Sequence, residues 1–393
     1  MPRYIHYFNP ENDLALASGD AHYTPPASAR QMARDLQSLP CLWAKAGDWV
    51  LLEDPPPALP QREGVESCDH SILSPSKVTT PSLEGRAGEG STGGGSTGGG
   101  SSPSKGNRFL PLREGGGRVY PLPWGWSPLA VRQLQERGVP SRLLPSPDEL
   151  AAYRAASSRR QAVRLLQQLR AQWPDAFRRG ELVGQSTWAV TLAAVSEACR
   201  RYGPTMLKAP WSGSGRGLHP VREQLSARDE AWVLRTLQRQ GAVEAEPLYQ
   251  RHLDFAMEFW ASRGRVSYCG LSLFATTPGG VYAGNLIAPE ADKERILSRY
   301  VSPRLLAEVR RRLLRLLAAA DLPAWYTGPL GVDMMIVNAP SAALHPLVEV
   351  NLRMTMGWVA LQLTPQLPHG QHGRFSIVSA GGRYHHEITF FDA

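Results

Sequence analysis

The sequence predicts a mixed α/β fold of the α+β kind, with a βαβ region ahead of units built on antiparallel hairpins. In the first half, short strand patterns alternate with helical patterns, which is the rhythm of a βαβ region. In the second half, two pairs of strand-like runs are each joined by a short turn, which predicts hairpins. With 393 residues, 42% of them hydrophobic and 20% charged, the chain can bury the core of two or three domains.

Composition excludes several classes of protein. No run approaches the roughly 18 to 20 apolar residues of a membrane span, and the start lacks a signal-peptide layout, so we expect no membrane partner and a cytoplasmic location. The net charge of +8 is spread over helical stretches such as residues 307–317, so nucleic acid is not expected as a partner. The cysteines are far apart, which indicates neither a zinc site nor a disulfide framework; they are Cys41, Cys68, Cys199 and Cys269.

The amino-terminal region is predicted to begin with a strand at residues 4–8, a helix near 27–36 and a strand near 49–52. The segment NPENDLALA follows the first strand, at the end where open α/β sheets bind ligands. Turn and helix-capping chemistry explains the same polar residues and is the favoured interpretation; they are Asn9, Glu11, Asn12 and Asp13.

A stretch rich in Gly, Ser and Thr interrupts this region at about residues 55–108. It has no apolar period, so we expect a flexible insertion, and its GSTGGG near-repeat is also typical of an engineered linker. A strand at residues 118–121 and a helix at 127–138 follow. Ser146 and Glu149 then form a capping box that begins a long helix running to about Trp173.

A lysine strand and a glycine loop follow an amphipathic helix that is predicted over residues 186–202. The strand runs from Thr205 to Lys208, and the loop at residues 212–217 alternates Gly with Ser and Arg. Backbone N–H groups in such a loop can approach phosphate oxygens because no Cβ intervenes. The lysine precedes the glycines, which fits neither a P-loop nor a kinase loop, and the glycine spacing is not the GxGxxG of a Rossmann turn. Alone, the loop is also typical of a glycine-rich surface turn.

The second half contains mostly strands. We expect a strand at residues 242–249, a hairpin over 254–274 that turns at residues 263 and 264, and a strand at 281–287. An amphipathic helix at residues 303–320 then leads to a second hairpin.

This second hairpin consists of residues 330–337 and 345–352, which flank the turn segment NAPSAA. Antiparallel pairing places Asp333 opposite Glu349 or Val350, and alternation places Glu349, Asn351 and Arg353 on one face. Carboxylate and amide oxygens suit Mg²⁺, and the guanidinium of Arg353 suits a phosphate beside it. A solvent-facing amphipathic hairpin would show the same alternation.

Taken together, the order of these elements resembles the ATP-grasp superfamily of ATP-dependent ligases. The order is lysine strand, glycine loop, EPLY connector, hairpin, helix, Asp strand and E-x-N-x-R strand, over roughly residues 184–360. The segments NPENDLALA, KAPWSGSGRGL and VEVNLRMTMG are similar to a little-characterised bacterial subgroup. The resemblance implies an ATP-grasp fold of two α+β subdomains that enclose ATP, residues 184–248 and 249–393, after a pre-grasp domain of residues 1–183.

The resemblance also implies roles for single residues. ATP and Mg²⁺ would be the cofactors, and the metal ligands would be Asp333, Glu349 and Asn351. Lys208 would contact the α- and β-phosphates and Arg353 would stabilise charge during transfer, with Arg216 as a further catalytic candidate. The nucleotide contacts would also include the phosphate-covering loop and the main chain at the adenine, namely Ser212, Gly213, Ser214, Gly215, Gly217, Glu246 and Leu248.

Two departures from the family pattern stand out. The family carries an earlier lysine, but no lysine lies between Lys105 and Lys208, so either an arginine replaces it or that contact is missing. The bulky Met354 and Met356 follow the E-x-N-x-R motif, which predicts a different acceptor pocket.

The expected function is therefore an ATP- and Mg²⁺-dependent ligase that joins a small-molecule carboxylate to an amine or thiol through an acyl-phosphate. The alternatives are a small-molecule kinase on the same fold and a non-catalytic ATP-binding regulatory protein. The candidates for substrate contacts are Arg216, Tyr282, Asn285 and Arg374, although a polar residue near a strand end is more often simply solvated.

Overall fold

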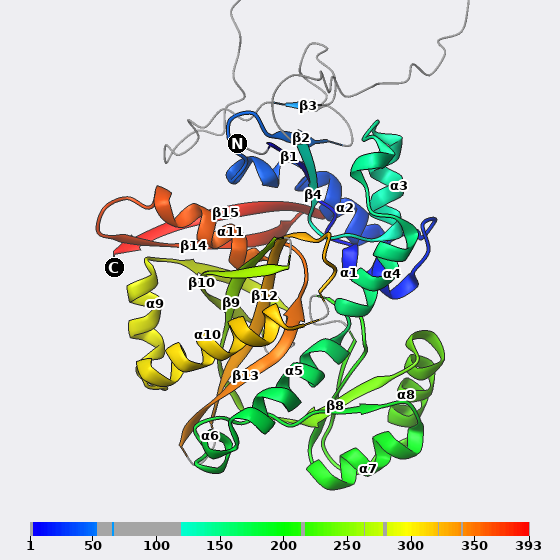
Figure 1. The fold of residues 1–393 in the computed structure, drawn as a ribbon, viewed down its shortest axis with the longest axis vertical. Coiled ribbons are helices and arrows are strands. Elements are labelled where there is room, and N and C mark those ends of the chain that lie inside the picture. The colour runs from blue at the N-terminus through cyan, green and yellow to red at the C-terminus, as the bar shows by residue number, and fades with distance from the viewer. Residues whose placement is uncertain are drawn as a thin grey trace, which may run out of the picture.

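Three sheets are arranged along the molecule in the computed structural model (Figure 1). The described residues are 3–52, 65–66, 119–213, 217–262, 264–277, 281–320, 322–338 and 341–392. The predicted flexible insertion at residues 55–108 lies outside them, apart from residues 65 and 66. Among the described residues, no helix is both long and apolar enough to cross a membrane.

The amino-terminal sheet has the strand order β3-β2-β1-β4. β1 pairs in parallel with both β2 and β4, and its Ile5 lies opposite Trp49 and Pro121, so the predicted βαβ region is confirmed. The strands are β1 (Arg3–Tyr7), β2 (Trp49–Leu51), β3 (Val65–Glu66) and β4 (Val119–Pro123). The accompanying helices are α1 (Asn12–Ser18), α2 (Ala27–Asp35), η1 (Leu39–Leu42), α3 (Pro128–Glu136), η2 (Ser141–Leu143), α4 (Pro147–Ala156), α5 (Arg159–Gln172) and α6 (Pro174–Arg178).

A four-stranded antiparallel sheet lies at the opposite end of the molecule, with the order β5-β8-β6-β7 (Figure 1). One face packs against two helices through Val195, Leu207, Val233 and Ala245, so Lys208, the neighbour of Leu207, extends from the other face. The elements are β5 (Thr187–Ala189), α7 (Leu192–Tyr202), β6 (Thr205–Lys208), β7 (Leu218–Val221), α8 (Ala227–Gln240) and β8 (Val243–Pro247).

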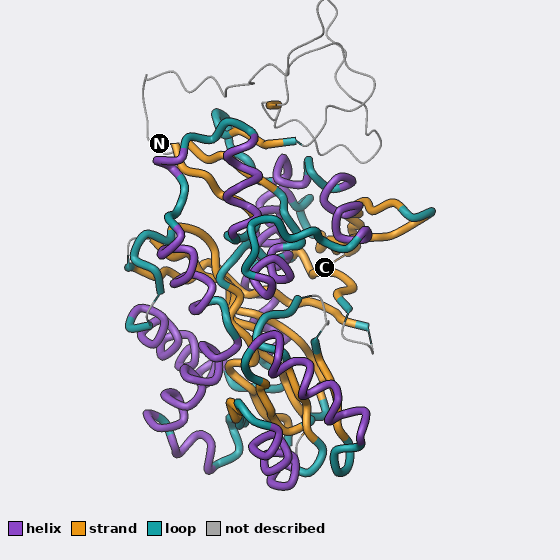
Figure 2. Tube along the Cα trace, turned by 90° about the vertical axis from the view of Figure 1, so that its right-hand side faces the viewer, coloured by secondary structure: helices purple, strands orange, loops and turns teal. Residues whose placement is uncertain are grey.

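A seven-stranded sheet lies between these two, and all its strand pairs are antiparallel. Both predicted hairpins belong to it. The elements are β9 (Arg251–Ser262), β10 (Arg265–Thr276), β11 (Tyr282–Ile287), α9 (Glu290–Leu297), α10 (Pro303–Ala318), β12 (Thr327–Asn338), β13 (Ala342–Asn351), α11 (Met356–Leu363), η3 (Thr364–Gln366), β14 (Gln371–Ala380) and β15 (Arg383–Asp392). In the view turned by 90° about the vertical axis, strands run through the middle of the molecule and helices lie on both sides of them (Figure 2).

The two faces of the seven-stranded sheet differ in chemistry. One face carries the main hydrophobic core with Phe255, Phe259, Val332 and Val350, and the apolar stripe of α10 packs into the same core. Because side chains alternate along a strand, the residues between them extend from the opposite face. This face bears the row of carboxylates Glu258, Asp333 and Glu349.

Several predicted elements need correction. The helix predicted over residues 186–202 begins only at Leu192, because Trp188 belongs to β5 and pairs with Glu244, and Thr191 caps the helix by accepting from the N–H of Ala194. The helix predicted from Ser146 to Trp173 is two helices, because Ser158 caps a new one. The sequence prediction missed β7, α8, α9, α11, β14 and β15, although α8 has a local signal in the capping box of Ser226 and Asp229.

Candidate functional site

The two acidic residues of the E-x-N-x-R hairpin lie at the same level of the sheet. Asp333 on β12 is directly opposite Glu349 on β13, which confirms one of the two predicted registers. The Nδ2 of Asn351 donates to Asp333 Oδ2 at 3.0 Å. Burial, together with the neighbouring Glu349, raises the pKa of Asp333 to about 7 against the opposing effect of Arg353.

Arg159, at the start of α5, joins this pair and was missed in the sequence. Its Nη1 lies 3.0 Å from Glu349 Oε2, and its Nη2 donates to Ser212 Oγ at 3.2 Å. Burial by itself would lower the pKa of Arg159, but Glu349, Glu244, Glu246 and Asp333 raise it above its ordinary value. The side chain is therefore a permanent buried cation. The one sequence feature that pointed to such an arginine was the absence of any lysine between Lys105 and Lys208.

Lys208 is buried in a second ion pair that faces the same cluster. Its Nζ lies 2.7 Å from Glu246 Oε1, and both side chains are almost completely inaccessible. Burial alone would lower the pKa of Lys208, but Glu246 and Glu244 raise it above its ordinary value. Arg159 acts on the pKa of Lys208 in the opposite direction, which places the two cations in one electrostatic network.

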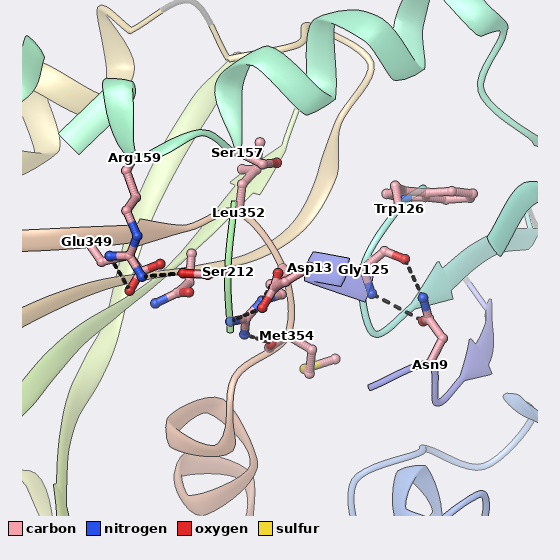
Figure 3. A network of polar contacts seen from close by, with 12 residues as sticks. Asn9, Asp13, Gly125, Trp126, Ser157, Arg159, Ser212, Glu349, Leu352 and Met354 are labelled. Carbon is pink, nitrogen blue, oxygen red and sulfur yellow. Dashed lines mark hydrogen bonds and ion pairs between the residues drawn. The ribbon is translucent and has the colours of Figure 1, made fainter. Parts of the chain in front are cut away.

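Arg353 follows β13 and contacts the amino-terminal segment. Its Nε donates to Asp13 Oδ1 and its Nη2 donates to Asp13 Oδ2, both at 2.9 Å. The nearby Asn9 contacts another loop, because its Nδ2 donates to Gly125 O at 2.9 Å. The helix α1 begins after Glu11, whose side chain makes no capping hydrogen bond. Helix capping therefore does not explain the NPENDLALA segment. Figure 3 shows Asp13 between the Asn9–Gly125 contact and the Arg159–Glu349 pair.

The glycine loop and the predicted adenine contact are only partly placed. The loop joins β6 to β7, and the N–H of Ala209 donates to Gly217 O at 2.9 Å across its base. Ser214, Gly215 and Arg216 lie outside the described residues, so their predicted roles stay predictions. The main-chain N–H of Leu248 donates to Pro204 O at 2.8 Å, and Glu246 points its carboxylate at Lys208; the adenine contact likewise stays a prediction.

Three of the four candidate substrate contacts bond within the protein. Tyr282 donates its hydroxyl to Asn285 Oδ1 at 2.7 Å, and Asn285 Nδ2 donates to Ser272 Oγ at 2.8 Å. The exposed Arg374 donates to Ala283 O at 2.7 Å. These three side chains are therefore not simply solvated, because each makes a hydrogen bond within the protein. Arg216 is the fourth.

Glu258 is a further buried acid that the sequence prediction missed. Its Oε1 accepts from Thr355 Oγ1 at 2.8 Å, whereas its Oε2 has no hydrogen-bond partner among the described residues. A Cβ added at Gly357 would lie 2.2 Å from Oε1, and one at Gly331 would lie 3.0 Å from Oε2. Burial raises the pKa of Glu258 to about 8, so these two glycines make space for a protonated carboxyl beside β12.

The space among the charged residues is nearly closed. A cavity of about 10 Å³ is lined by Asp13, Ser212, Glu349, Asn351, Arg353 and their neighbours. This is room for about one water molecule. Side chains must therefore move before a nucleotide phosphate can enter.

Comparisons with known proteins give structural likeness only. No family model and no curated protein matches the chain. An N5-carboxyaminoimidazole synthase from Aspergillus clavatus, solved with ADP and 5-aminoimidazole ribonucleotide, is 15% identical with a TM-score of 0.40 over 67% of this chain and 65% of that one. Biotin carboxylase from Campylobacter jejuni, solved with β-γ-ATP, is 16% identical with a TM-score of 0.39 over 66% and 58%.

A third similar structure, from Archaeoglobus fulgidus, is provisionally assigned to the ATP-grasp superfamily, which the sequence also resembles. It is 13% identical, with a TM-score of 0.38 over 70% of this chain and 76% of that chain. The match covers 65% of the N5-carboxyaminoimidazole synthase and 58% of the biotin carboxylase, so the chain spans less than two thirds of the length of each. At these TM-scores the likeness assigns neither an activity nor a substrate to this chain.

Proposed function

We propose that this protein is an ATP-grasp ligase that uses Mg²⁺ and ATP to join a carboxylate to an amine or thiol. The observation that carries the proposal is the convergence of Asp333 and Glu349, opposite each other in the sheet, with Arg159 and Arg353 beside them. Lys208 belongs to the same electrostatic network through Arg159. Oxygen ligands and cations are combined here at one edge of the sheet, at the start of a glycine loop. This is the chemistry that phosphoryl transfer needs, because it depends on positioning and electrostatic stabilisation.

The donor set fits Mg²⁺. Asp333, Glu349 and the amide oxygen of Asn351 are hard oxygen donors. No cluster of three or more His, Cys, Asp or Glu side chains among the described residues could hold a metal by itself. This agrees with Mg²⁺, which takes one or two carboxylates and completes its shell with water and substrate phosphates. When bound, the ion would neutralise phosphate charge.

The arginines and the lysine would bind the phosphates. Arg159 lies in the interval between Lys105 and Lys208 that has no lysine, and we assign it the role of the missing earlier lysine because it is buried, fork-shaped and permanently charged. Lys208 is held as a cation by Glu246 and Glu244, and in the complex it would exchange part of that pairing for phosphate oxygens. We assign Arg353 to the developing charge during transfer.

The proposed reaction has two steps. A carboxylate oxygen of the substrate attacks the γ-phosphorus of ATP, the bond from that phosphorus to the β,γ-bridging oxygen breaks, and ADP leaves. The amine nitrogen or thiol sulfur then attacks the acyl carbon, the carbon–oxygen bond to phosphate breaks, and the nucleophile loses its proton. The products are the amide or thioester, ADP and inorganic phosphate.

A trapping experiment tests this function. The full chain is incubated with Mg²⁺, ATP and hydroxylamine, with a panel of carboxylic acids supplied one at a time. A ligase should release ADP and form a hydroxamate, which mass spectrometry identifies, with particular acids only. ADP release that requires a hydroxylated acceptor and gives a phosphorylated product would establish the kinase alternative. ATP binding without turnover across the panel would favour the regulatory alternative.

A further inference from the structure

The carboxylate of Asp13 fills the hydrogen-bonding fork of Arg353. The two bonds, both 2.9 Å, form a bidentate pair between Nε and Nη2 of the guanidinium and the two carboxylate oxygens. This is the geometry with which an arginine binds a substrate carboxylate or two oxygens of a phosphoryl group. An incoming oxyanion therefore has to compete with Asp13 for the same two donors.

The segment that carries Asp13 is fixed by hydrogen bonds of buried side chains. Asn9 exchanges two hydrogen bonds with Gly125, donating to its O at 2.9 Å and accepting from its N–H at 3.3 Å. The side-chain amide of Asn12 faces the same turn, and with its nitrogen turned toward the carbonyls of Gly125 and Trp126 it donates to both at 3.0 Å. Both asparagines are buried. The segment after β1 thus presents Asp13 to a residue 340 positions later in the chain.

The surroundings disfavour a carboxylate in the presence of substrate. Asp13, Glu349 and Asp333 all raise the pKa of Arg353. Asp13 also lines the same small cavity as Glu349. The glycine loop is also close, because a Cβ at Gly213 would lie 2.3 Å from Asp13 Oδ2. A phosphoryl or carboxylate group arriving at the fork of Arg353 would meet the negative charge of Asp13 on the same two donors, so Asp13 must give way.

We propose that Asp13 is a place-holder anion: it occupies the oxyanion site of Arg353 in the empty protein, and the substrate oxyanion displaces it. The identity of that oxyanion, a substrate carboxylate or a transferring phosphoryl group, rests on the proposed function. Displacement would break the ion pair that joins this segment to Arg353, while the buried contacts of Asn9 would keep the segment in place. Asp13 is a positioning residue in this scheme.

The test measures anion affinity by isothermal titration calorimetry with inorganic phosphate and, separately, with acetate. Asp13→Asn empties the fork, and the full-length variant should bind one of these anions about fivefold more tightly than the wild type, the effect of removing a partly exposed ion pair. A larger gain for phosphate indicates a phosphoryl site, and a larger gain for acetate indicates a carboxylate site. Gly213→Ala, which crowds Asp13 without removing its charge, should shift the affinity in the same direction.

Two further variants control the experiment. Asp35→Asn removes another aspartate that pairs with an arginine far along the chain, with Oδ1 at 2.8 Å from Arg383 Nε, and it should leave anion affinity unchanged. Asp13→Asn combined with Arg353→Gln should lose the gain. Unchanged affinity in both Asp13→Asn and Gly213→Ala, or a gain that survives Arg353→Gln, would overturn the proposal. These anion titrations do not depend on ATP. If Asp13→Asn binds phosphate more tightly than the wild type but the protein does not bind Mg-ATP, the proposed function is rejected and the place-holder role of Asp13 stands.

Discussion

Asp333 and Glu349 face each other across β12 and β13 at one level of an antiparallel ladder. Two carboxylates in this position repel each other, and burial adds to the cost of ionising both. The protein compensates with guanidinium groups, of which Arg159 lies 3.0 Å from Glu349. A divalent cation between the carboxylates would relieve the same repulsion.

The carboxylate pair gives the first prediction. Mg²⁺ with ATP should stabilise the wild-type protein by about 2.7 kcal/mol when the nucleotide is at roughly 100 times its Kd. Asp333→Asn and Glu349→Gln should each lose the Mg²⁺-dependent part of this gain because a metal ligand is missing. Thermal unfolding with ATP, in the presence and absence of Mg²⁺, measures it. Glu294→Gln on α9, whose side chain is 45% exposed, is the control; Mg²⁺-dependent stabilisation in both site variants would refute the metal site.

The second prediction concerns Arg159. Replacing it by Met should weaken ATP binding about tenfold or more, since a buried charge-assisted contact to phosphate is lost. Arg159→Lys should restore part of the affinity, because the charge returns without the fork. Its neighbour Arg160 is exposed, so Arg160→Met is a matched control in the same helix. Equal affinities for the two methionine variants, measured by calorimetry, would remove Arg159 from the nucleotide site.

The third prediction concerns the buried pair of Lys208 and Glu246. Lys208→Met leaves the Glu246 carboxylate buried without its cation and should lower the free energy of unfolding by about 3 kcal/mol or more. Adding Glu246→Leu should recover much of that loss, because an apolar pair of similar volume can replace a buried ion pair. Urea unfolding of the single and double variants checks this. If the double variant were no more stable than Lys208→Met, the coupling would be absent.

The fourth prediction is a pH dependence. Burial raises the pKa of Glu258 to about 8, well above its value in an unfolded chain. The folded state therefore holds this proton more tightly, and the contribution of Glu258 to stability falls as the pH rises from about 4 to about 8. Glu258→Gln cannot ionise, so its melting temperature relative to the wild type should increase across that range. A constant difference between the two proteins would show that Glu258 titrates normally.

Local signals in the sequence predicted much of the scaffold. Ser146 and Glu149 form the expected capping box, because both halves of that motif lie within one helical turn. Alternation of polar and apolar residues predicted β12 and β13 and left two partners for Asp333, Glu349 and Val350, of which the structure shows Glu349. The metal-ligand set followed from the same alternation, although its role stays a prediction.

Where local signals compete, the sequence prediction was wrong. Trp188 has the helical spacing of an amphipathic face with Leu192 and Val195, but pairing with Glu244 on β8 places it in a strand. The break between α4 and α5 depends on Ser158 as a cap, a role that a serine in an arginine-rich stretch does not reveal. Tertiary pairing overrides weak local preference in such cases.

The sequence by itself determined the order of lysine strand, glycine loop and acidic hairpin, since each depends on residues close together in the chain. Only the tertiary structure decided that Arg159 joins Glu349, that Glu258 lies buried over two glycines, and that Asp13 fills the fork of Arg353. Arg159 and Glu349 lie 190 positions apart in the chain, and Asp13 and Arg353 lie 340 positions apart. Glu258 lies 97 positions before Thr355, its hydrogen-bond donor. No local pattern encodes such a distance, because it is set by how the three sheets pack.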